Sequence, residues 1–329
     1  MTRDSHRSGD MFQWICRRLC RSIDIILSVG DFVMKRNRAA GFAVVTVIYS
    51  AAILIGVAVF AVLSNMSILF RILAGDITAT VFVYLTGVAL KNASVYDPYW
   101  SVAPIVIYTG IAFVSGRSDA GTLLLLAAVW YWGVRLTANW ARTFKNLDTQ
   151  DWRYDGFKEK YPRAFQIISL FGINLFPTMV VFLCLLPGVE FIKESAYNFL
   201  TLFGFVICVF AATLQLVADM QMHRFRRRHA GKRLLIREGL WKHSRHPNYL
   251  GEIMMWWGVY IIMLSSAPRM WGLIAGPIVN TLMFLFVSIP MADKRNRSER
   301  PGFDEYVRET NSLLPFRLKG CFENQVQDS

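Results

Sequence analysis

Long apolar runs separated by short polar stretches are the dominant pattern along the chain. A helix needs about 20 predominantly apolar residues to cross the ~30 Å hydrocarbon layer of a bilayer. Windows of this length predict eight crossings, of which 102–115 is the least well defined, at residues 41–63, 72–90, 102–115, 120–138, 165–187, 197–218, 248–266 and 271–291. We therefore expect an all-α, polytopic transmembrane helix bundle with about seven or eight crossings.

The composition agrees with this pattern. Of the 329 residues, 54% are hydrophobic and only 18% are charged, which is more apolar than a soluble domain of this size requires. No Gly/Ser-rich or Pro-rich linker divides the chain. We expect a basic amphipathic N-terminal extension at 1–40, a single membrane domain at 41–318 and a polar tail at 319–329.

The positive charges are distributed unevenly between the two sides of this predicted topology. Of the 36 Lys and Arg residues, all lie on the N-terminal side of the membrane except five, namely Arg71, Arg117, Arg135, Lys193 and Arg269. Cytoplasmic loops collect Lys and Arg, so the N-terminus and the long polar loops are expected in the cytoplasm, at the endoplasmic reticulum of a eukaryote or the inner membrane of a bacterium. This orientation and the attraction of basic residues to anionic headgroups explain the net charge of +13. Nucleic-acid binding is therefore not expected.

The five cysteines show no paired spacing, so structural disulfides are not expected. Cys16 and Cys20 lie on an N-terminal segment whose apolar residues recur at helical spacing, which favours an interfacial helix. Both remain open as acylation sites or as unmodified thiols. The polar regions 91–101, 139–163, 219–247 and the tail from 292 lie on one predicted side, where we expect them to cover a central cavity.

Several polar residues enter the predicted crossings. An ionisable residue inside a span needs a partner and often marks a functional site. Arg135, Asn139 and Arg142 share one helix face, although Arg135 near a helix end can also extend to the headgroups. Gln215 and Asp219 repeat this spacing at the end of the sixth crossing, where capping is the alternative role for Asp219.

The stretch SRHPNYLGE (244–252) starts the seventh crossing. With Pro247 in the first turn, Asn248 and Glu252 share a helix face, and Glu252 enters an apolar environment. Arg245 or His246 can neutralise Glu252 as a structural pair, or can hold an anionic ligand at the helix N-terminus. The preceding loop is rich in arginine, whose guanidinium groups suit phosphate, so a phosphorylated cofactor fits it as well as a solvated basic face does.

Six ordered motifs resemble those of the steroid 5-alpha-reductase-like integral membrane reductases. They are DPYWS (97–101), R-x-x-x-N-W-x-R (135–142), DWRY (151–154), A-D-x-Q-M-x-x-F (218–225), GLWKHSRHPNYLGE (239–252) and PGFDEY followed by LLPF (301–316). The resemblance covers about residues 75 to 318 and is of the type with a C-terminal steroid dehydrogenase domain. It implies NADPH, taken from the cytoplasmic side, and reduction of an activated carbon–carbon double bond in a lipid. The chain lacks G-x-G-x-x-G after a strand, a P-loop and metal-ligand spacing, so no metal and no Rossmann domain are expected.

The resemblance also implies roles for individual residues. It places the cofactor against Gln215, Asp219, Arg226, Asn248, Tyr249, Glu252 and Arg295, with Gln215 standing where steroid reductases carry asparagine. Asp97 resembles the family's substrate-facing glutamate and Tyr131 its partner tyrosine. We expect Asp97, Tyr131 and Glu252 to be catalytic, and Arg245 and His246 to join the cofactor-binding residues.

Three functions remain open from the sequence. The expected one is NADPH-dependent reduction of a steroid, sterol or isoprenoid-like enone by hydride transfer. An S-adenosylmethionine-dependent methyltransferase of the isoprenylcysteine or phospholipid type shares R-H-P-x-Y-x-G, and a non-catalytic lipid-binding homologue would keep the same fold. The lipid substrate and the oligomeric state are not specified by the sequence.

Overall fold

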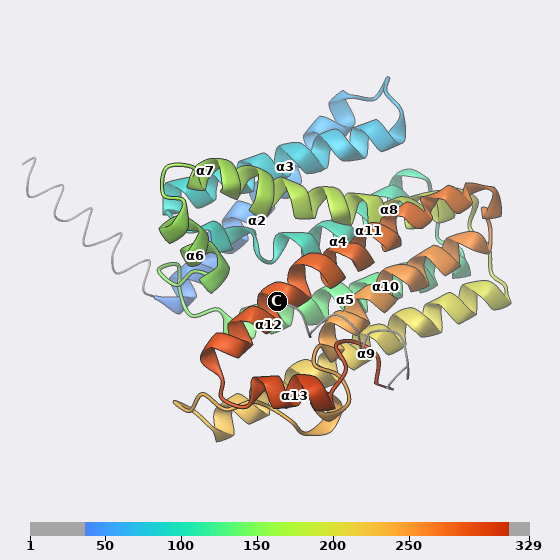
Figure 1. Ribbon diagram of the computed structural model, residues 1–329. Helices are drawn as coiled ribbons and strands as arrows, with labels where there is room; N and C mark the ends of the chain where they lie inside the picture. The colour runs from blue at the N-terminus through green and yellow to red at the C-terminus, as the bar shows by residue number, and fades with distance from the viewer. Residues whose placement is uncertain (1–36, 316–329) are drawn as a thin grey trace, which may run out of the picture.

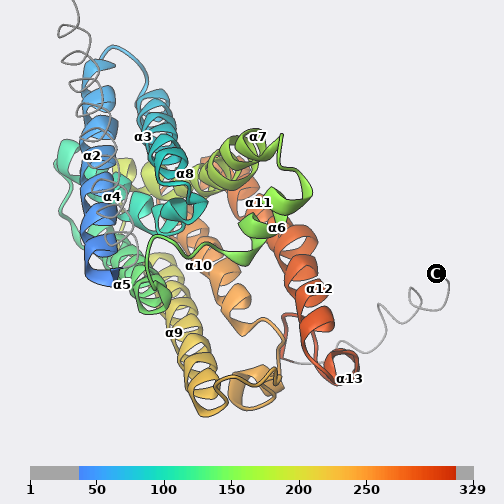
Figure 2. The same ribbon diagram turned by 90° about the vertical axis from the view of Figure 1, so that its left-hand side faces the viewer.

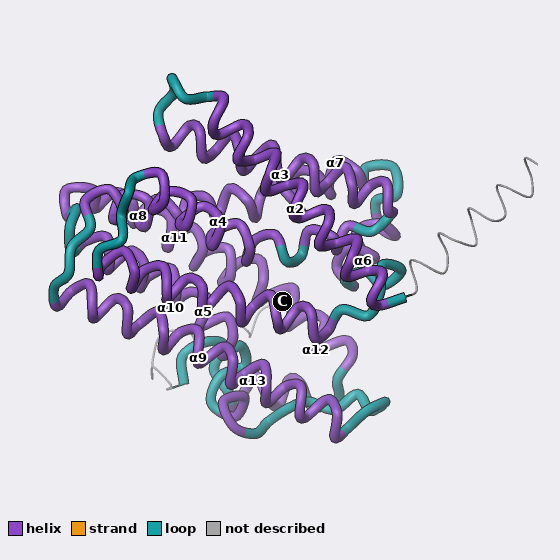
Figure 3. The backbone as a smooth tube through the Cα atoms, turned by 180° about the vertical axis from the view of Figure 1, so that it is seen from behind, coloured by secondary structure: helices purple, strands orange, loops and turns teal. Residues whose placement is uncertain are grey.

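The computed structural model describes residues 37–315, and throughout this range the chain is built from helices and loops (Figure 3). The predicted interfacial helix with Cys16 and Cys20, and the predicted polar tail 319–329, lie outside the described residues. The elements are α2 (Arg38–Val62), α3 (Ile68–Leu90), η1 (Ala93–Tyr96), α4 (Tyr99–Val114), α5 (Ala120–Thr143), α6 (Trp152–Lys160), α7 (Phe165–Ile168), η2 (Ser169–Leu175), α8 (Phe176–Glu194), α9 (Phe199–Arg228), η3 (Gly239–Lys242), α10 (Pro247–Leu264), η4 (Pro268–Ile274), α11 (Ala275–Met283), η5 (Phe284–Ser288), α12 (Ile289–Glu299) and α13 (Phe303–Glu309).

Each of the eight predicted crossings coincides with helix, which confirms the polytopic helical bundle. Six helical stretches within residues 37–315 are long and apolar enough to span a membrane: Arg38–Val62, Ile68–Leu90, Ala120–Thr143, Phe165–Glu194, Phe199–Arg228 and Pro268–Glu299. The other two predicted crossings are shorter or more polar: α4 has 16 residues, and α10 has 18 but begins with the polar sequence PNYLGE. The chain is thus a multi-pass membrane protein.

Local sequence explains where the long helices begin. The side chain of Asn37 accepts two backbone N–H bonds at the start of α2, and Ser67 and Asp119 cap α3 and α5 in the same way. Asn198 and Thr201 form a capping box at the start of α9. Two of the spans contain a π-helical segment, η2 and η5. The span with η5 also begins with the 3-10 segment η4, which is kinked at Met270.

The interior of the bundle is organised around α9 and α10, which lie side by side (Figure 1). Small residues allow this close approach: a Cβ added to Gly204 would lie 2.8 Å from the carbonyl oxygen of Gly258, and one on Gly251 would lie 2.7 Å from that of Ala211. Around this pair, large side chains from α4, α5, α8 and α10 form the core, with Trp132 and Trp256 in edge-to-face contact at 5.2 Å. The register of α9 against α10 fixes the polar residues described below.

One end of the bundle, called the polar end here, carries η1, the loop before α6, η3 and α13. Asn92 donates to the carbonyl oxygens of Leu147 and Thr149 at 2.6 and 3.1 Å, and the backbone N–H of Asp151 donates to Ser94 Oγ at 2.8 Å. The loops 91–101 and 139–163 therefore pack together across the same end, as the sequence predicts. In Figure 2, which looks toward this end, α10 lies between α5 and α9 on one side and α12 on the other.

Candidate functional site

The first part of the site is an ionic cluster between α5 and α9. Arg135 is only 7% exposed, and its Nη1 lies 2.9 Å from Asp219 Oδ2. Its Nη2 donates to Gln215 Oε1, so one guanidinium holds both polar residues of the α9 stripe. Breaking such a buried pair is costly because it leaves a charge uncompensated. The structure thus brings Gln215 and Asp219 together on a partner from α5, and Arg135 takes the internal role rather than extending to the headgroups.

Glu252 lies beside this cluster, one turn inside α10, and both of its carboxylate oxygens are occupied. Trp132 Nε1 donates to Oε2 at 2.9 Å, and Trp256 Nε1 donates to Oε1 at 3.0 Å. The charge of Glu252 also acts on Arg135. We call Arg135, Gln215, Asp219 and Glu252 the polar cluster; its members hold one another in fixed positions where α5, α9 and α10 meet.

Neither Arg245 nor His246, the partners that the sequence suggested for Glu252, contacts it. Both bind Asp293 of α12 instead: Arg245 Nη2 lies 3.1 Å from Oδ2, and His246 Nε2 lies 2.8 Å from Oδ1. Arg245 also donates to the carbonyl oxygen of Thr310 at 2.5 Å. These contacts form a brace that ties the start of α10 to α12 and to the end of α13, so both side chains are engaged by the protein.

Tyr249 connects the brace to the centre of the site. Its ring lies parallel to that of His246, with centroids 5.1 Å apart, and it packs against Phe284 of the π-helical segment η5. The charges of Arg153, Asp151, Asp293 and Asp219 also act on its hydroxyl, so charged groups of α6, α9 and α12 lie near Tyr249. Asn248 is half-buried and makes no side-chain hydrogen bond to any part of the chain that the structure describes. Its amide group is therefore free to bind a ligand.

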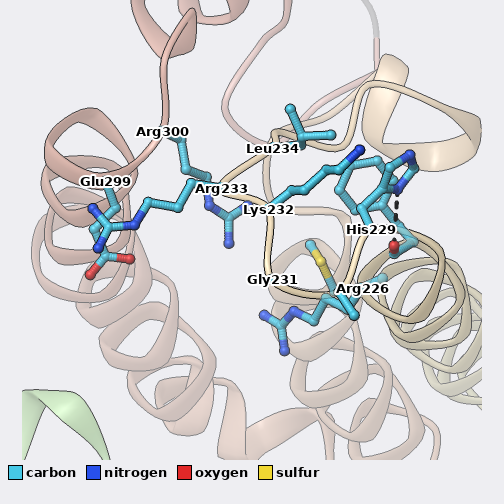
Figure 4. Close-up of a pocket in the computed structure, with 11 residues that line it drawn as sticks. Arg226, His229, Gly231, Lys232, Arg233, Leu234, Glu299 and Arg300 are labelled. Atoms are coloured by element: carbon cyan, nitrogen blue, oxygen red, sulfur yellow. Dashed lines mark hydrogen bonds between the residues drawn. The ribbon is translucent and has the colours of Figure 1, made fainter.

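A basic pocket of about 280 Å³ adjoins these residues at the polar end (Figure 4). The C-terminal turns of α9, the following loop and the end of α12 line it, and its charged or titratable residues are Arg226, His229, Lys232, Arg233, Glu299 and Arg300. Figure 4 shows Arg226, Arg233 and Arg300 on different sides of the pocket. Burial, and then the positive charges of Arg226 and Arg295, lower the pKa of Arg300. The pocket thus holds four positive side chains and one carboxylate, that of Glu299. Such an excess of positive charge favours binding of an anion.

Arg295 lies next to this pocket but outside its lining. Its guanidinium stacks over the ring of Trp152 in α6 at 4.4 Å, and its Nε lies 2.9 Å from Glu299 Oε1. Its charge still acts on Arg226 and Arg300. Arg295 therefore adds to the positive potential while fastening α12 to α6.

Asp97 and Tyr131 occupy different surroundings. Asp97 follows η1 and accepts a 2.7 Å hydrogen bond from Tyr154, and burial raises its pKa to about 6. Tyr131 is 36% exposed on α5, where its hydroxyl contacts Thr213 Oγ1 at 3.2 Å. The tyrosine paired with Asp97 is thus Tyr154, which belongs to the DWRY motif that the sequence singled out.

Four residues of these sites were not among the sequence candidates. Asp76 of α3 is 6% exposed and accepts a 2.7 Å hydrogen bond from Tyr99. Its signal was present, because it is a lone carboxyl in the apolar run 72–90. Trp256 could be found at i+4 from Glu252, whereas Trp132 and Asp293 come from distant segments and had no local signal.

Comparison with known proteins identifies a family and gives no activity. The model of a family described as "Protein of unknown function (DUF1295)" matches residues 83–310, which is more than half of the chain. An uncharacterized protein of Schizosaccharomyces pombe is 24% identical over 266 residues, covering 72% of this chain and 76% of the relative. No solved structure matches. The family is one associated with steroid 5-alpha-reductase-like membrane proteins. By the extent of the match, this chain belongs to the DUF1295 family.

Proposed function

We propose that this protein is an NADPH-dependent membrane oxidoreductase that reduces an activated carbon–carbon double bond of a steroid, sterol or isoprenoid-like enone. The observation that supports it most is the position of Arg226. This residue lines the basic pocket, and its charge acts on Asp219 of the polar cluster. An anion site and a set of fixed polar groups are therefore continuous along α9.

The donor set fits a phosphorylated nucleotide. Guanidinium groups bind phosphate oxygens through paired, charge-assisted hydrogen bonds, and three arginines with one lysine line the pocket. Its volume of about 280 Å³ accommodates one phosphorylated part of a dinucleotide, so the remainder would extend across the polar end toward Tyr249. The half-buried amide of Asn248 then suits a carboxamide, which needs one donor and one acceptor.

When bound, NADPH supplies the hydride, and the chain supplies position and exclusion of water. Arg226, Arg233 and Arg300 hold the phosphates, and Tyr249 and Asn248 orient the other end. Glu252 and its two tryptophans form a packed wall beneath them. Asp97, whose pKa is about 6, donates a hydrogen bond or proton to a substrate oxygen in its acid form. Reduction should therefore slow as the pH rises through about 6.

Ligand-induced stabilisation of the purified, full-length protein tests this proposal. NADPH at about 100 times its Kd should add about 2.7 kcal/mol of stability, whereas S-adenosylmethionine should add none. Arg233→Gln and Arg300→Gln should each weaken NADPH binding about tenfold or more, since a hydrogen bond to a charged group contributes about 1.5–3 kcal/mol. Arg224→Gln, an exposed arginine of α9 outside the pocket, is the matched control.

The alternatives give different results in the same assay. Stabilisation by S-adenosylmethionine and not by NADPH would support the methyltransferase function and reject the reductase function. Stabilisation by NADPH without its oxidation in the presence of any enone tested would leave a non-catalytic homologue. Equal binding by Arg300→Gln and the wild type would remove the basic pocket from the cofactor site.

A further inference from the structure

A second cavity lies away from the polar cluster, between the first three described helices. It has a volume of about 320 Å³ and is lined by α2 from Tyr49 to Phe60, by α3 from Arg71 to Ala79 and by α4 from Tyr99 to Val114. Figure 3 shows α2 and α3 as a hairpin on this side of the molecule. We call this cavity the α2–α4 groove. It shares no residue with the basic pocket or the polar cluster.

The groove opens toward the hydrocarbon layer. Three apolar residues at its margin are exposed, namely Val57 on α2 and Phe113 and Val114 on α4. These residues belong to helices that are apolar on their outer faces, and apolar side chains exposed on such helices contact lipid tails. A molecule that fills the groove therefore arrives from the membrane, and most of its surface must be apolar.

Asp76 is the single carboxyl group among the groove residues. Its Oδ1 accepts the 2.7 Å hydrogen bond from Tyr99, and its Oδ2 accepts no hydrogen bond from residues 37–315. Arg71, the cation that lines the groove, is engaged elsewhere: its Nε donates to the carbonyl oxygen of Phe60 at 2.8 Å, and its guanidinium lies 4.0 Å from the centre of the Phe60 ring. A carboxylate oxygen in apolar surroundings without a donor is costly, so a hydrogen-bond donor brought by a ligand would be favoured.

The position of Asp76 limits that donor to a small, uncharged group. It lies eight residues into α3, which corresponds to about 12 Å along the helix. A phosphate headgroup would be repelled by the carboxylate and would have to leave the interface. An ammonium group would carry the desolvation penalty of a charge, whereas a hydroxyl donates a hydrogen bond at much lower cost. We propose that the α2–α4 groove binds a membrane lipid alcohol, whose hydroxyl donates to Asp76 and whose apolar body lies between α2 and α4.

Photo-crosslinking of the full-length protein in liposomes tests the groove independently of NADPH. The probe is a sterol with a free hydroxyl, a diazirine and an alkyne; its matched control is the same molecule oxidised to the ketone, which lacks the donor. We expect the alcohol to label α2–α4 saturably. Its half-maximal concentration should be at least tenfold lower than that of the ketone. Equal labelling by the two probes would overturn the proposal.

Two substitutions separate recognition of the hydroxyl from filling of the groove. Asp76→Asn offers a donor where the carboxylate offered an acceptor, so the preference should shift toward the ketone by about tenfold. Gly110 lines the groove and has nothing within 4 Å of an added Cβ, so Gly110→Leu should block labelling without a clash. Gly272→Leu has the same open space outside the groove and should label like the wild type. Unchanged labelling in both groove variants would contradict the assignment.

A photoreactive amino acid at position 110 identifies the occupant directly. A crosslink from position 110 to the sterol supports the proposal. A crosslink to a second copy of the chain, or to residues 1–36 of the same chain, would overturn it. NADPH-induced stabilisation, measured on the same variants, should stay unchanged in Asp76→Asn. If the wild type does not bind NADPH, the proposed reductase function fails. The result for the groove would remain valid in that case.

Discussion

Buried carboxyl groups occur in both the polar cluster and the α2–α4 groove, but their partners differ. In the polar cluster, Glu252 accepts from two indoles and Asp219 pairs with a guanidinium. In the groove, Asp76 has one tyrosine partner and an oxygen that accepts nothing from the described residues. Burial alone does not identify a binding group. The number of donors already supplied by the fold distinguishes a carboxylate that holds helices together from one that can receive a ligand.

This comparison assigns different roles to two regions of the same bundle. The ligand-accessible chemistry at the polar end lies in the basic pocket and at Asn248, while the polar cluster holds these elements in register. In the groove, the accessible chemistry is the carboxyl group itself. Substitutions in the polar cluster should therefore reduce stability strongly, and substitutions at Asp76 should change mainly what is bound.

The largest effect is expected from Arg135→Met. It removes the guanidinium that pairs with Asp219 and Gln215, and loss of one partner of a buried ion pair costs about 3–5 kcal/mol. The free energy of unfolding in mixed micelles measures this. The double variant Arg135→Met, Asp219→Leu should recover much of the loss, because it removes the uncompensated carboxylate. A loss below about 1 kcal/mol in the single variant would show that the cluster is not a structural element.

Glu252→Ala should follow, with a loss of about 2–4 kcal/mol, since the indole N–H groups of Trp132 and Trp256 would both lose their acceptor. NADPH turnover should also be lost in this variant. Glu252→Gln keeps one carbonyl acceptor, so its loss of stability should be about half of the loss in Glu252→Ala. The same unfolding titration measures Glu252→Ala and Glu252→Gln. Trp256→Phe, which removes one of the two indole donors, is measured alongside them for comparison. Equal stability of Glu252→Ala and the wild type would mean that the two indole bonds contribute nothing.

The sequence predicted faces of helices better than it predicted which helices meet. Helical spacing placed Gln215 and Asp219 on one stripe of α9, and charge in an apolar run identified Arg135; the structure joins all three. Spacing carries no information about the neighbour across the interface. Trp132 lies 120 positions from Glu252 in the chain, so their contact depends on the packing of α5 against α10.

Two pairings suggested by the sequence differ from the contacts in the structure. Arg245 and His246 are close to Glu252 in sequence, but the turn before α10 directs them toward α12, where Asp293 binds both. Tyr131 was matched to Asp97 by resemblance, whereas α6 places Tyr154 against Asp97. Asp76 could have been predicted by the rule that identified Arg135. Its unengaged oxygen could not, because that depends on the contact of Arg71 with Phe60.

Asp97 provides a smaller, pH-dependent test of the same comparison, since it lies at the polar end with one tyrosine partner, as Asp76 does in the groove. Burial raises its pKa from 3.8 to about 6. The folded state therefore holds this proton more tightly than the unfolded state, and the associated stability is present below about pH 4 and is lost as the pH rises through about 6. A shift of this size corresponds to a loss of about 3 kcal/mol.

Asp97→Asn should abolish this part of the pH dependence, because asparagine keeps an oxygen for the hydroxyl of Tyr154 but does not titrate. Unfolding free energies of the two proteins between pH 4 and 8 should converge at low pH and separate above pH 6, with Asp97→Asn the more stable. Asp155→Asn, at an exposed carboxyl group of α6, controls for a general change in charge. Parallel curves for Asp97→Asn and the wild type would show that Asp97 is hydrated well enough to ionise freely, and its role as a proton donor to the substrate would then fail at neutral pH.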